Sequence, residues 1–342
     1  MSGRTLALCD HDEIDLSNGV VILSDQSLGS YAVIGDLLAA TFTRDGIAVD
    51  QRALDEGYVP VLESAPVSRP VVHNTIGPRF APSPGTTNIA LVHHEWDRYP
   101  RAWVERLNGF DWIWVTTEFV GKVLSVSGVR KPIRLVRPAL DLEPVPERRT
   151  YRLGRPFRVL ACGEPHFRKG FHLLVEGFLA AFPTPDEAIL TIKTSPSCSW
   201  TSPRRDVQIV TARRDRAAWL GQYRNHDLYV TASLGEGVGL PVAEAILAGV
   251  PVAATYWGGH ESLLQPGAFY RIPHRVVPQP FCSSLEFYAA GQRCAYADPR
   301  AIAATLRRAA RASAAERRTM ATRARVALRE RYGWKAVSKQ AA

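Results

Sequence analysis

Short runs of apolar residues recur along the chain, and stretches whose apolar positions have helical spacing lie between them. The runs are too short for helices and rich in Val, Ile and Leu, which is typical of buried strands. They comprise residues 20–23, 71–73, 89–94, 112–117, 133–136, 157–162, 189–192, 207–210, 228–231 and 252–255. The intervening stretches, such as 32–42 and 119–126, predict helices. Alternation of this kind predicts an α/β protein whose parallel sheets are covered by helices.

A break in the alternation divides the chain. Residues 138–155 are rich in Pro and charged residues, which is typical of a linker, and the alternation restarts after them. A length of 342 residues fits two domains. We therefore expect a first domain over residues 1–138, a linker over 139–155 and a second domain over 156–325. Both domains would be Rossmann-like and face a cleft, with ligands beyond the carboxyl ends of the strands.

The composition is that of an ordinary soluble globular protein, with 46% apolar and 22% charged residues. No apolar run approaches the length of a membrane span, and the first residues lack the apolar core of a signal peptide. The five cysteines are scattered and form no C-x-x-C pair. We therefore expect reduced thiols in a cytoplasmic protein.

The net charge of +9 is concentrated near the C-terminus. Residues 300–342 contain ten Arg and two Lys but only two Glu, whereas the remainder carries 30 basic and 31 acidic residues. Two interpretations are open. The simpler one is a solvated, arginine-rich helical face. The other is attraction to a polyanion, either a nucleic acid or an anionic membrane at which the protein would be peripheral.

The most informative stretch runs from Gly235 to Glu244, where the carboxylates of Glu236 and Glu244 lie eight residues apart across a glycine-rich turn. Pro241 suits the first helical position, and Gly249 suits the end of the helix. Backbone N–H groups at the start of a helix attract anions, so a phosphate and a polyol can be held at one place. The alternative is that Glu236 is a solvated loop residue and that Glu244 only complements the helix dipole.

Other loops that follow predicted strands carry further candidates. One places Arg168 and Lys169 between a strand and a helix, which suits a pyrophosphate. Residues 24–31 form a similar but weaker strand–loop–helix unit around Gly29. Residues 92–100 contain adjacent His and acidic residues. We expect no metal there, because neighbouring residues of a strand point to opposite faces.

The stretch 235–244, with its flanking residues 227–233 and 249–252, resembles the E-x7-E signature of family 4 retaining glycosyltransferases. Members of that family have the GT-B fold of two Rossmann-like domains. The resemblance implies that Glu236 contacts the donor sugar and that Glu244 binds the ribose of the nucleotide.

Other segments extend this resemblance. The loop around Lys169 resembles the family's diphosphate-binding segment, although Glu164 stands where the family has an Arg. Either Arg168 supplies the second positive charge, or Lys169 and the backbone bind alone. His94 and Glu95 lie in a loop that resembles the one facing the donor sugar, and we expect one of the two to point at the sugar. The implied catalytic residues are Glu236, Lys169, His94 and Glu95. The implied diphosphate-binding residues are Gly29, Arg168, Lys169, Gly235, Gly237, Val238 and Gly239, and the implied base-binding residues are Thr211, Ala212 and Arg213.

The first domain would bind the acceptor, and residues 326–342 resemble the family's last helix, which crosses back to that domain. The implied activity is transfer of a hexosyl group, with retention, from a nucleoside diphosphate sugar to a hydroxyl of a glycan, polysaccharide or lipid-linked acceptor. UDP and GDP are the favoured nucleotides, and no metal or cofactor is implied. Two alternatives remain open: the same chemistry on a hydroxylated nucleic-acid base, and a GT-B protein that binds without turnover.

Overall fold

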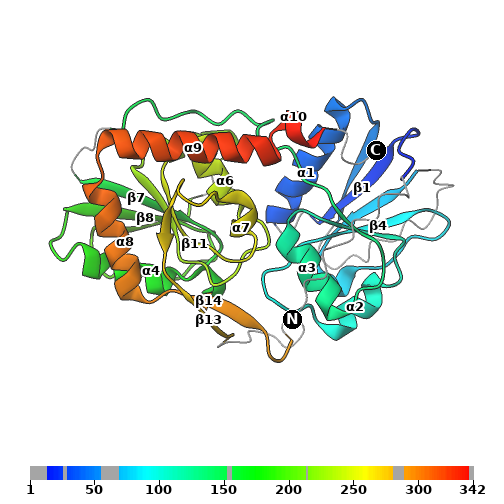
Figure 1. The fold of residues 1–342 in the computed structure, drawn as a ribbon, viewed down its shortest axis with the longest axis horizontal. Helices are drawn as coiled ribbons and strands as arrows, with labels where there is room; N and C mark the ends of the chain where they lie inside the picture. Colours follow the sequence, from blue (N-terminus) through cyan, green and yellow to red (C-terminus); the bar gives the residue numbers. More distant parts are fainter. Residues whose placement is uncertain are drawn as a thin grey trace. The chain divides into compact units, whose positions relative to one another are not determined.

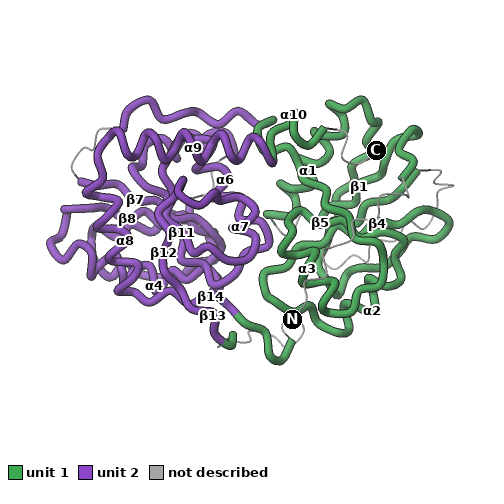
Figure 2. The backbone as a smooth tube through the Cα atoms, viewed as in Figure 1, with its two compact units in different colours: residues 1–142, 278–293, 332–342 green, residues 143–277, 294–331 purple. Residues whose placement is uncertain are grey.

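The computed structural model describes most of the chain. The described residues are 14–25, 29–54, 69–151, 156–212, 215–279 and 289–338. The chain divides into two compact units, which Figure 2 distinguishes by colour. Unit 1 consists of residues 1–142, 278–293 and 332–342, and unit 2 consists of residues 143–277 and 294–331. The sequence-based boundaries differ in treating 139–155 as a separate linker and 278–293 as part of the second domain.

Unit 1 is built on a six-stranded parallel sheet with the order β2-β1-β3-β4-β5-β6. Figure 1 labels two of its strands, β1 and β4. Its strands are β1 (Val20–Asp25), β2 (Val49–Leu54), β3 (Val71–Asn74), β4 (Asn88–Val92), β5 (Trp112–Val115) and β6 (Ile133–Leu135). Its helices are α1 (Gly29–Arg44), the short 3-10 helix η1 (Gly77–Arg79), α2 (Arg101–Leu107), α3 (Glu118–Ser127) and α10 (Trp334–Val337).

Unit 2 contains a second six-stranded parallel sheet, with the order β12-β11-β10-β7-β8-β9. Its strands are β7 (Phe157–Cys162), β8 (Ala188–Lys193), β9 (Val207–Val210), β10 (Leu228–Thr231), β11 (Val252–Thr255) and β12 (Tyr270–Ile272). Its helices are η2 (Phe167–Lys169), α4 (Phe171–Ala181), α5 (Arg216–Tyr223), α6 (Leu240–Leu247), α7 (His260–Leu263), α8 (Pro299–Arg311) and α9 (Ala314–Tyr332). The strands β13 (Arg275–Pro278) and β14 (Arg293–Tyr296) form a separate two-stranded sheet.

The prediction of an α/β protein with parallel sheets is confirmed. The central strands were visible in the sequence because both faces are covered, which makes their side chains almost uniformly apolar. Strand β2 was not predicted, since it lies at the edge of its sheet and has three consecutive polar residues, Asp50, Gln51 and Arg52. Helix α6 begins at Leu240, so Pro241 occupies the second helical position instead of the first. None of the helices in the described ranges is long and apolar enough to span a membrane.

The C-terminal end of the chain packs within unit 1. Tyr332 Oη donates a hydrogen bond to the backbone oxygen of Thr116 (3.0 Å), and the Leu140 N–H donates to the backbone oxygen of Tyr332 (2.8 Å). The indole N–H of Trp334 donates to Asp45 Oδ1 (3.0 Å) just beyond α1. These bonds fix residues 332–334 to the end of strand β5 and to the residue that follows helix α1.

Helix α1 approaches β1 and β3 closely at Gly35. A Cβ atom at this position would lie 2.0 Å from Ser24 Oγ and 3.1 Å from Asn74 Nδ2. Because Asn74 Nδ2 already donates to Ser24 Oγ (3.1 Å), neither side chain can move away without losing a buried hydrogen bond. The polar carboxyl ends of these two strands thus depend on a glycine in the helix above them.

We expect Gly35→Ala to destabilise the protein by about 1–3 kcal/mol through overpacking. Thermal unfolding measures this effect, and each kcal/mol should lower the midpoint by about 2–4 °C. Gly221→Ala in α5 is the matched control, because a Cβ added there would have no atom of the described residues within 4 Å beyond its immediate surroundings in the helix. Its midpoint should stay unchanged or rise, since Ala favours a helix by about 1 kcal/mol over Gly. Equal midpoints for the two variants would contradict this account.

Candidate functional site

Three loops of unit 2 meet at the carboxyl edge of its sheet. Strands β7, β10 and β11 are neighbours in the sheet, so the loops that follow them are neighbours too. These loops are residues 163–170, 232–239 and 256–259. Ligands of open parallel sheets bind at this edge. The two strongest motifs of the sequence therefore come together in one place.

Backbone hydrogen bonds hold these loops to one another. The Leu234 N–H donates to the backbone oxygen of Arg168 (2.8 Å), and the Gly259 N–H donates to that of Glu236 (2.7 Å). The second approach requires glycine, because a Cβ at Gly259 would lie 2.3 Å from the backbone oxygen of Gly237. The positions of the charged side chains are thus set by a rigid backbone arrangement.

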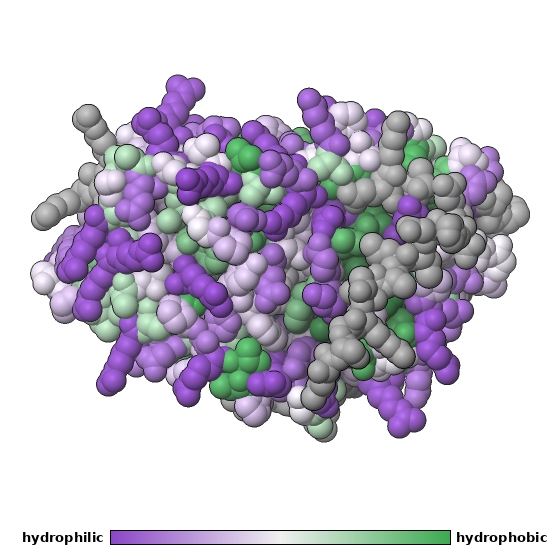
Figure 3. Space-filling model, viewed as in Figure 1, coloured by the Kyte–Doolittle hydropathy of each residue, from purple (hydrophilic) through white to green (hydrophobic). Residues whose placement is uncertain are grey.

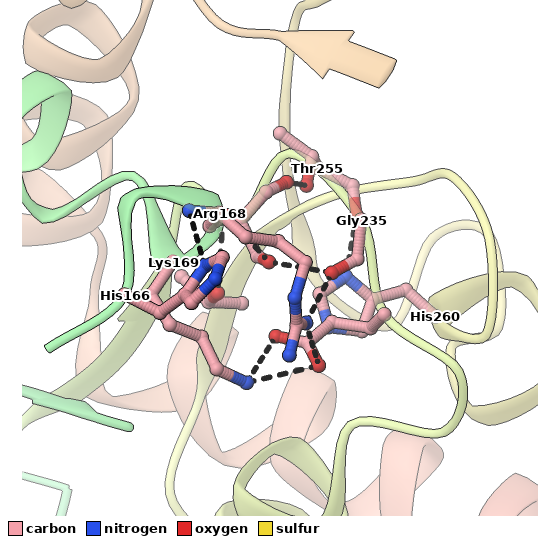
Figure 4. Close-up of polar contacts among 9 residues, drawn as sticks. His166, Arg168, Lys169, Gly235, Thr255 and His260 are labelled. Carbon is pink, nitrogen blue, oxygen red and sulfur yellow. Dashed lines mark hydrogen bonds and ion pairs between the residues drawn. The ribbon is translucent and has the colours of Figure 1, made fainter. Parts of the chain in front are cut away.

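Glu236 is the centre of an ion-pair cluster (Figure 4). Lys169 Nζ lies 2.7 Å and 3.0 Å from its two carboxylate oxygens, and an Arg168 guanidinium nitrogen lies 3.0 Å from one of them. The same Arg168 nitrogen donates to the backbone oxygen of Gly235 (2.6 Å). The Glu236 side chain is buried, with 8% of the residue exposed. It is therefore not a solvated loop acid.

The electrostatics of this cluster keep Glu236 ionised. Burial raises the pKa of Glu236, but the neighbouring charges of Lys169 and Arg168 outweigh it, so the pKa lies well below its usual range. His260 lies beside the cluster, and its Nδ1–H donates to the backbone oxygen of Thr255 (3.0 Å). Burial lowers the pKa of His260. The imidazole is therefore neutral, with Nε2 as an acceptor.

Glu244, in the second turn of α6, is held by two side chains of α5. Tyr223 Oη donates to one carboxylate oxygen (2.6 Å), and Arg216 lies 2.9 Å from the other. Arg216 also lies 2.7 Å from a carboxylate oxygen of Glu143. Glu244 is 8% exposed. Its orientation is therefore fixed by direct contacts, which the helix dipole alone would not provide.

The implied base-binding residues follow β9. Thr211 is partly buried and Ala212 is exposed, while Arg213 lies outside the described residues. Of the loop glycines, Gly239 precedes α6 with φ +94°, beside the ring of His260. Val238 is buried.

The remaining implied residues belong to unit 1 and are described within it. Gly29 is the exposed first residue of α1. His94 is only 2% exposed, and its Nε2–H donates to the backbone oxygen of Arg98 (2.7 Å). The edge of its ring contacts Tyr99, with 5.0 Å between ring centroids. Glu95 is partly buried. Their approach to a donor sugar stays a prediction.

A row of polar side chains at the carboxyl edge of the unit 1 sheet was not identified from the sequence. His93 Nε2–H donates to Asn74 Oδ1 (3.2 Å), and Thr116 Oγ1 donates to His93 Nδ1 (3.4 Å). Asn74 in turn donates to Ser24. Burial lowers the pKa of His93 to about 4, so the ring is neutral. Their position in the sequence could have identified these residues, since each lies at or just after the end of a predicted strand.

In unit 2, the sequence did not single out Arg216, Tyr223 or His260. Arg216 and Tyr223 are seven residues apart, at positions that share one face of α5. Without knowledge that this face covers Glu244, nothing distinguishes them from ordinary surface and core residues. His260 follows the paired glycines Gly258 and Gly259, which were the available signal.

Comparison with known proteins identifies the family and the fold. The sequence model of a family described as "Family 4 Glycosyltransferase in conflict systems" matches residues 115–340. No curated protein matches the sequence.

Solved structures match over most of the chain. HepE from Anabaena, solved with UDP and glucose, aligns with a TM-score of 0.64 and 12% identity, covering 94% of this chain and 97% of HepE. Sucrose-phosphate synthase from Thermosynechococcus elongatus aligns with a TM-score of 0.62 and 16% identity, with 94% and 97% covered. TarM from S. aureus aligns with a TM-score of 0.54 and 12% identity over 80% of this chain, which spans about half (54%) of TarM. These likenesses show the GT-B fold.

The Glu236 cluster predicts a specific response to an anion. Glu236→Gln leaves two largely buried cations without their counter-ion, so we expect the ligand-free protein to lose roughly 3–5 kcal/mol of stability. Inorganic pyrophosphate should raise the thermal midpoint more in this variant than in the wild type, because it supplies the missing negative charge.

Asp186→Asn is the control for this measurement. It removes the ion pair with Arg205, whose side chains are 74% (Arg205) and 55% (Asp186) exposed. Such surface pairs contribute about 0–1 kcal/mol, so little change is expected with or without pyrophosphate. A Glu236→Gln variant that pyrophosphate stabilises no more than the wild type would refute the competition between carboxylate and anion.

Proposed function

The chain belongs to the family 4 glycosyltransferases, and we propose that it transfers a hexosyl group from a nucleoside diphosphate sugar to an acceptor hydroxyl with retention of configuration. The observation that carries this proposal is the cluster of Lys169 and Arg168 around Glu236, with Glu244 eight residues further along. UDP and GDP sugars are the proposed donors. HepE was solved with UDP and glucose, which supports a UDP sugar by analogy of fold.

In the proposed mechanism, each charged side chain of the site has a separate role. As the bond between sugar and diphosphate breaks, negative charge grows on the leaving diphosphate, and Lys169 and Arg168 stabilise it. Glu236, released from these cations, accepts hydrogen bonds from the sugar hydroxyls. Glu244 accepts hydrogen bonds from the ribose and is held in place by Tyr223.

Retention would follow from the direction of attack. The acceptor hydroxyl approaches from the face that the diphosphate leaves, and a phosphate oxygen of the donor takes its proton. No side chain serves as a covalent nucleophile in this scheme, and the cations, instead of a metal ion, neutralise the leaving group. His94 and Glu95 of unit 1 are proposed to contact the donor sugar during turnover.

Lys169→Ala tests the catalytic role directly. We expect the turnover number to fall by on the order of a hundredfold, because the lost charge acts on the transition state. The measurement is steady-state release of UDP from UDP-glucose without acceptor. Lys122→Ala, at an exposed position of α3, is the control and should leave turnover unchanged. A rise in the Michaelis constant alone would make Lys169 a uniform binder and contradict the assignment.

The alternative is a GT-B protein that binds nucleotide sugars without turnover. The same assay separates the two, since a binding protein would bind UDP-glucose in calorimetry and release no UDP. The intact set of Glu236, Glu244 and Lys169 supports the enzyme.

The basic C-terminal region, residues 300–342, provides evidence on the charge of the acceptor. Six of its ten arginines are engaged within the protein, by hydrogen bonds, an ion pair or an aromatic ring: Arg307, Arg308, Arg317, Arg318, Arg325 and Arg331. Figure 3 shows hydrophilic side chains over α8 and α9 on the face in view. Because most of these arginines already have partners within the protein, few are available to bind a polyanion such as a nucleic acid or an anionic membrane. This favours the interpretation of the region as a solvated helical face, and a neutral glycan as the acceptor.

We expect little salt dependence of acceptor binding. Arg300 and Arg311 are exposed on the same side of α8, and replacing both by Ser should leave the affinity for an oligosaccharide acceptor unchanged. Duplex DNA is the probe for the polyanion alternative. A log–log salt slope of about −3 or steeper that flattens in the double variant would overturn this expectation.

A further inference from the structure

Helix α5 turns one face toward Glu244 and the end of strand β8. Its residues Arg216, Trp219 and Tyr223 are three and four positions apart, so they lie on the same side of the helix. Arg216 and Tyr223 bind Glu244. Trp219 instead contacts the ammonium group of Lys193, whose Nζ lies 5.5 Å from the ring centroid. This face thus connects the carboxylate of Glu244 with a cation at the edge of the sheet.

Lys193 ends β8 and lies on the side of the sheet that α5 covers, since its ammonium group faces Trp219. In the parallel register it lies beside Cys162 of β7 and Val210 of β9, and residues paired in this way share a face. Burial raises the pKa of the Cys162 thiol, on which the charges of Glu244, Lys193 and Lys169 also act. Cys162, the neighbour of Lys193 in the sheet, therefore lies within the electrostatic influence of both Glu244 and Lys169.

Lys193 differs from Lys169 in its partners. Lys169 lies 2.7 Å from a carboxylate oxygen. In the part of the chain that the structure describes, no carboxylate lies within ion-pair distance of Lys193, and its ammonium group instead faces the ring of Trp219. The residue is partly buried. A partly buried cation without a counter-ion is costly unless a ligand supplies the missing acceptor.

We propose that Lys193 and Trp219 form the subsite for the base of the donor nucleotide, and that Lys193 selects a base with a carbonyl oxygen at its edge, uracil or guanine. The inference rests on the proposed function, because it takes Glu244 to bind the ribose. The position of α5 supports it. Strand β8 is next to β7 in the sheet, and α5, which holds Glu244 through Arg216 and Tyr223, also places Trp219 against Lys193 at the end of β8.

The chemistry of the ammonium group sets the selectivity. It donates hydrogen bonds and accepts none. Uracil and guanine carry carbonyl oxygens where cytosine and adenine carry amino groups, whose hydrogens repel a cation. Trp219 adds an apolar surface against which a base ring packs. The subsite should therefore prefer an oxo group over an amino group on bases of the same size.

Isothermal titration calorimetry with two matched pairs of nucleotides tests this preference. UDP and CDP differ in one oxo or amino group, as do IDP and ADP. We expect the wild type to bind the oxo member of each pair about tenfold more tightly or better, because the amino member loses a hydrogen bond from a charged donor. In Lys193→Met, which keeps the apolar stem against Trp219, each preference should fall below about threefold. Lys193→Arg should retain it.

Inorganic pyrophosphate separates base selection from phosphate binding. Its affinity should be the same in the wild type and Lys193→Met, whereas Lys169→Met should weaken pyrophosphate and all four nucleotides. If Lys193→Met weakens pyrophosphate as much as UDP, or if the wild type binds UDP and CDP equally, the base subsite is wrong and the donor assignment stands. If the wild type binds none of the nucleotides, the proposed function fails and the subsite with it.

Discussion

The carboxylate of Glu236 compensates two cations at the edge of the unit 2 sheet, and the rest of the candidate site depends on this interaction. The side chains of Lys169 and Arg168 are only 15% and 16% exposed, so water cannot compensate their charges fully and Glu236 is needed as their counter-ion. A diphosphate offers more negative charge, and more hydrogen-bond acceptors, in a larger group. Ligand-free and donor-bound states can therefore use the same cations, first with the carboxylate and then with the diphosphate. The proposed mechanism depends on this exchange of the Glu236 carboxylate for the diphosphate.

The fold serves this exchange by holding the cations still. Three adjacent parallel strands bring three loops together, and backbone hydrogen bonds between the loops restrict the motion that isolated loops would have. Glycines occur where backbones touch, as at Gly259. Farther along the edge, α5 fixes Glu244 through Tyr223 and Arg216. The proposed donor half of the site is thus preorganised within a single unit.

The sequence predicted what depends on local pattern. Buried parallel strands read as apolar runs, and the loop motifs at residues 163–170 and 235–244 were placed correctly at strand ends, because strand, glycine loop and helix follow one another in the chain. What stayed hidden depends on contacts between distant residues. No local signal links Arg216 to Glu143, or His93 to Asn74, and the polar edge strand β2 resembles a loop. The pairing of Lys169 with Glu236, which are 67 residues apart, also needed the structure.

A structure of the protein with a bound UDP sugar tests the central claim most directly, through the partners of Lys169 Nζ. The account predicts that Lys169 Nζ lies within hydrogen-bond distance of a diphosphate oxygen and that the Glu236 carboxylate has lost at least one of its present contacts and faces the sugar hydroxyls. A complex in which Lys169 and Arg168 keep both contacts to Glu236, with the diphosphate bound elsewhere, would contradict it.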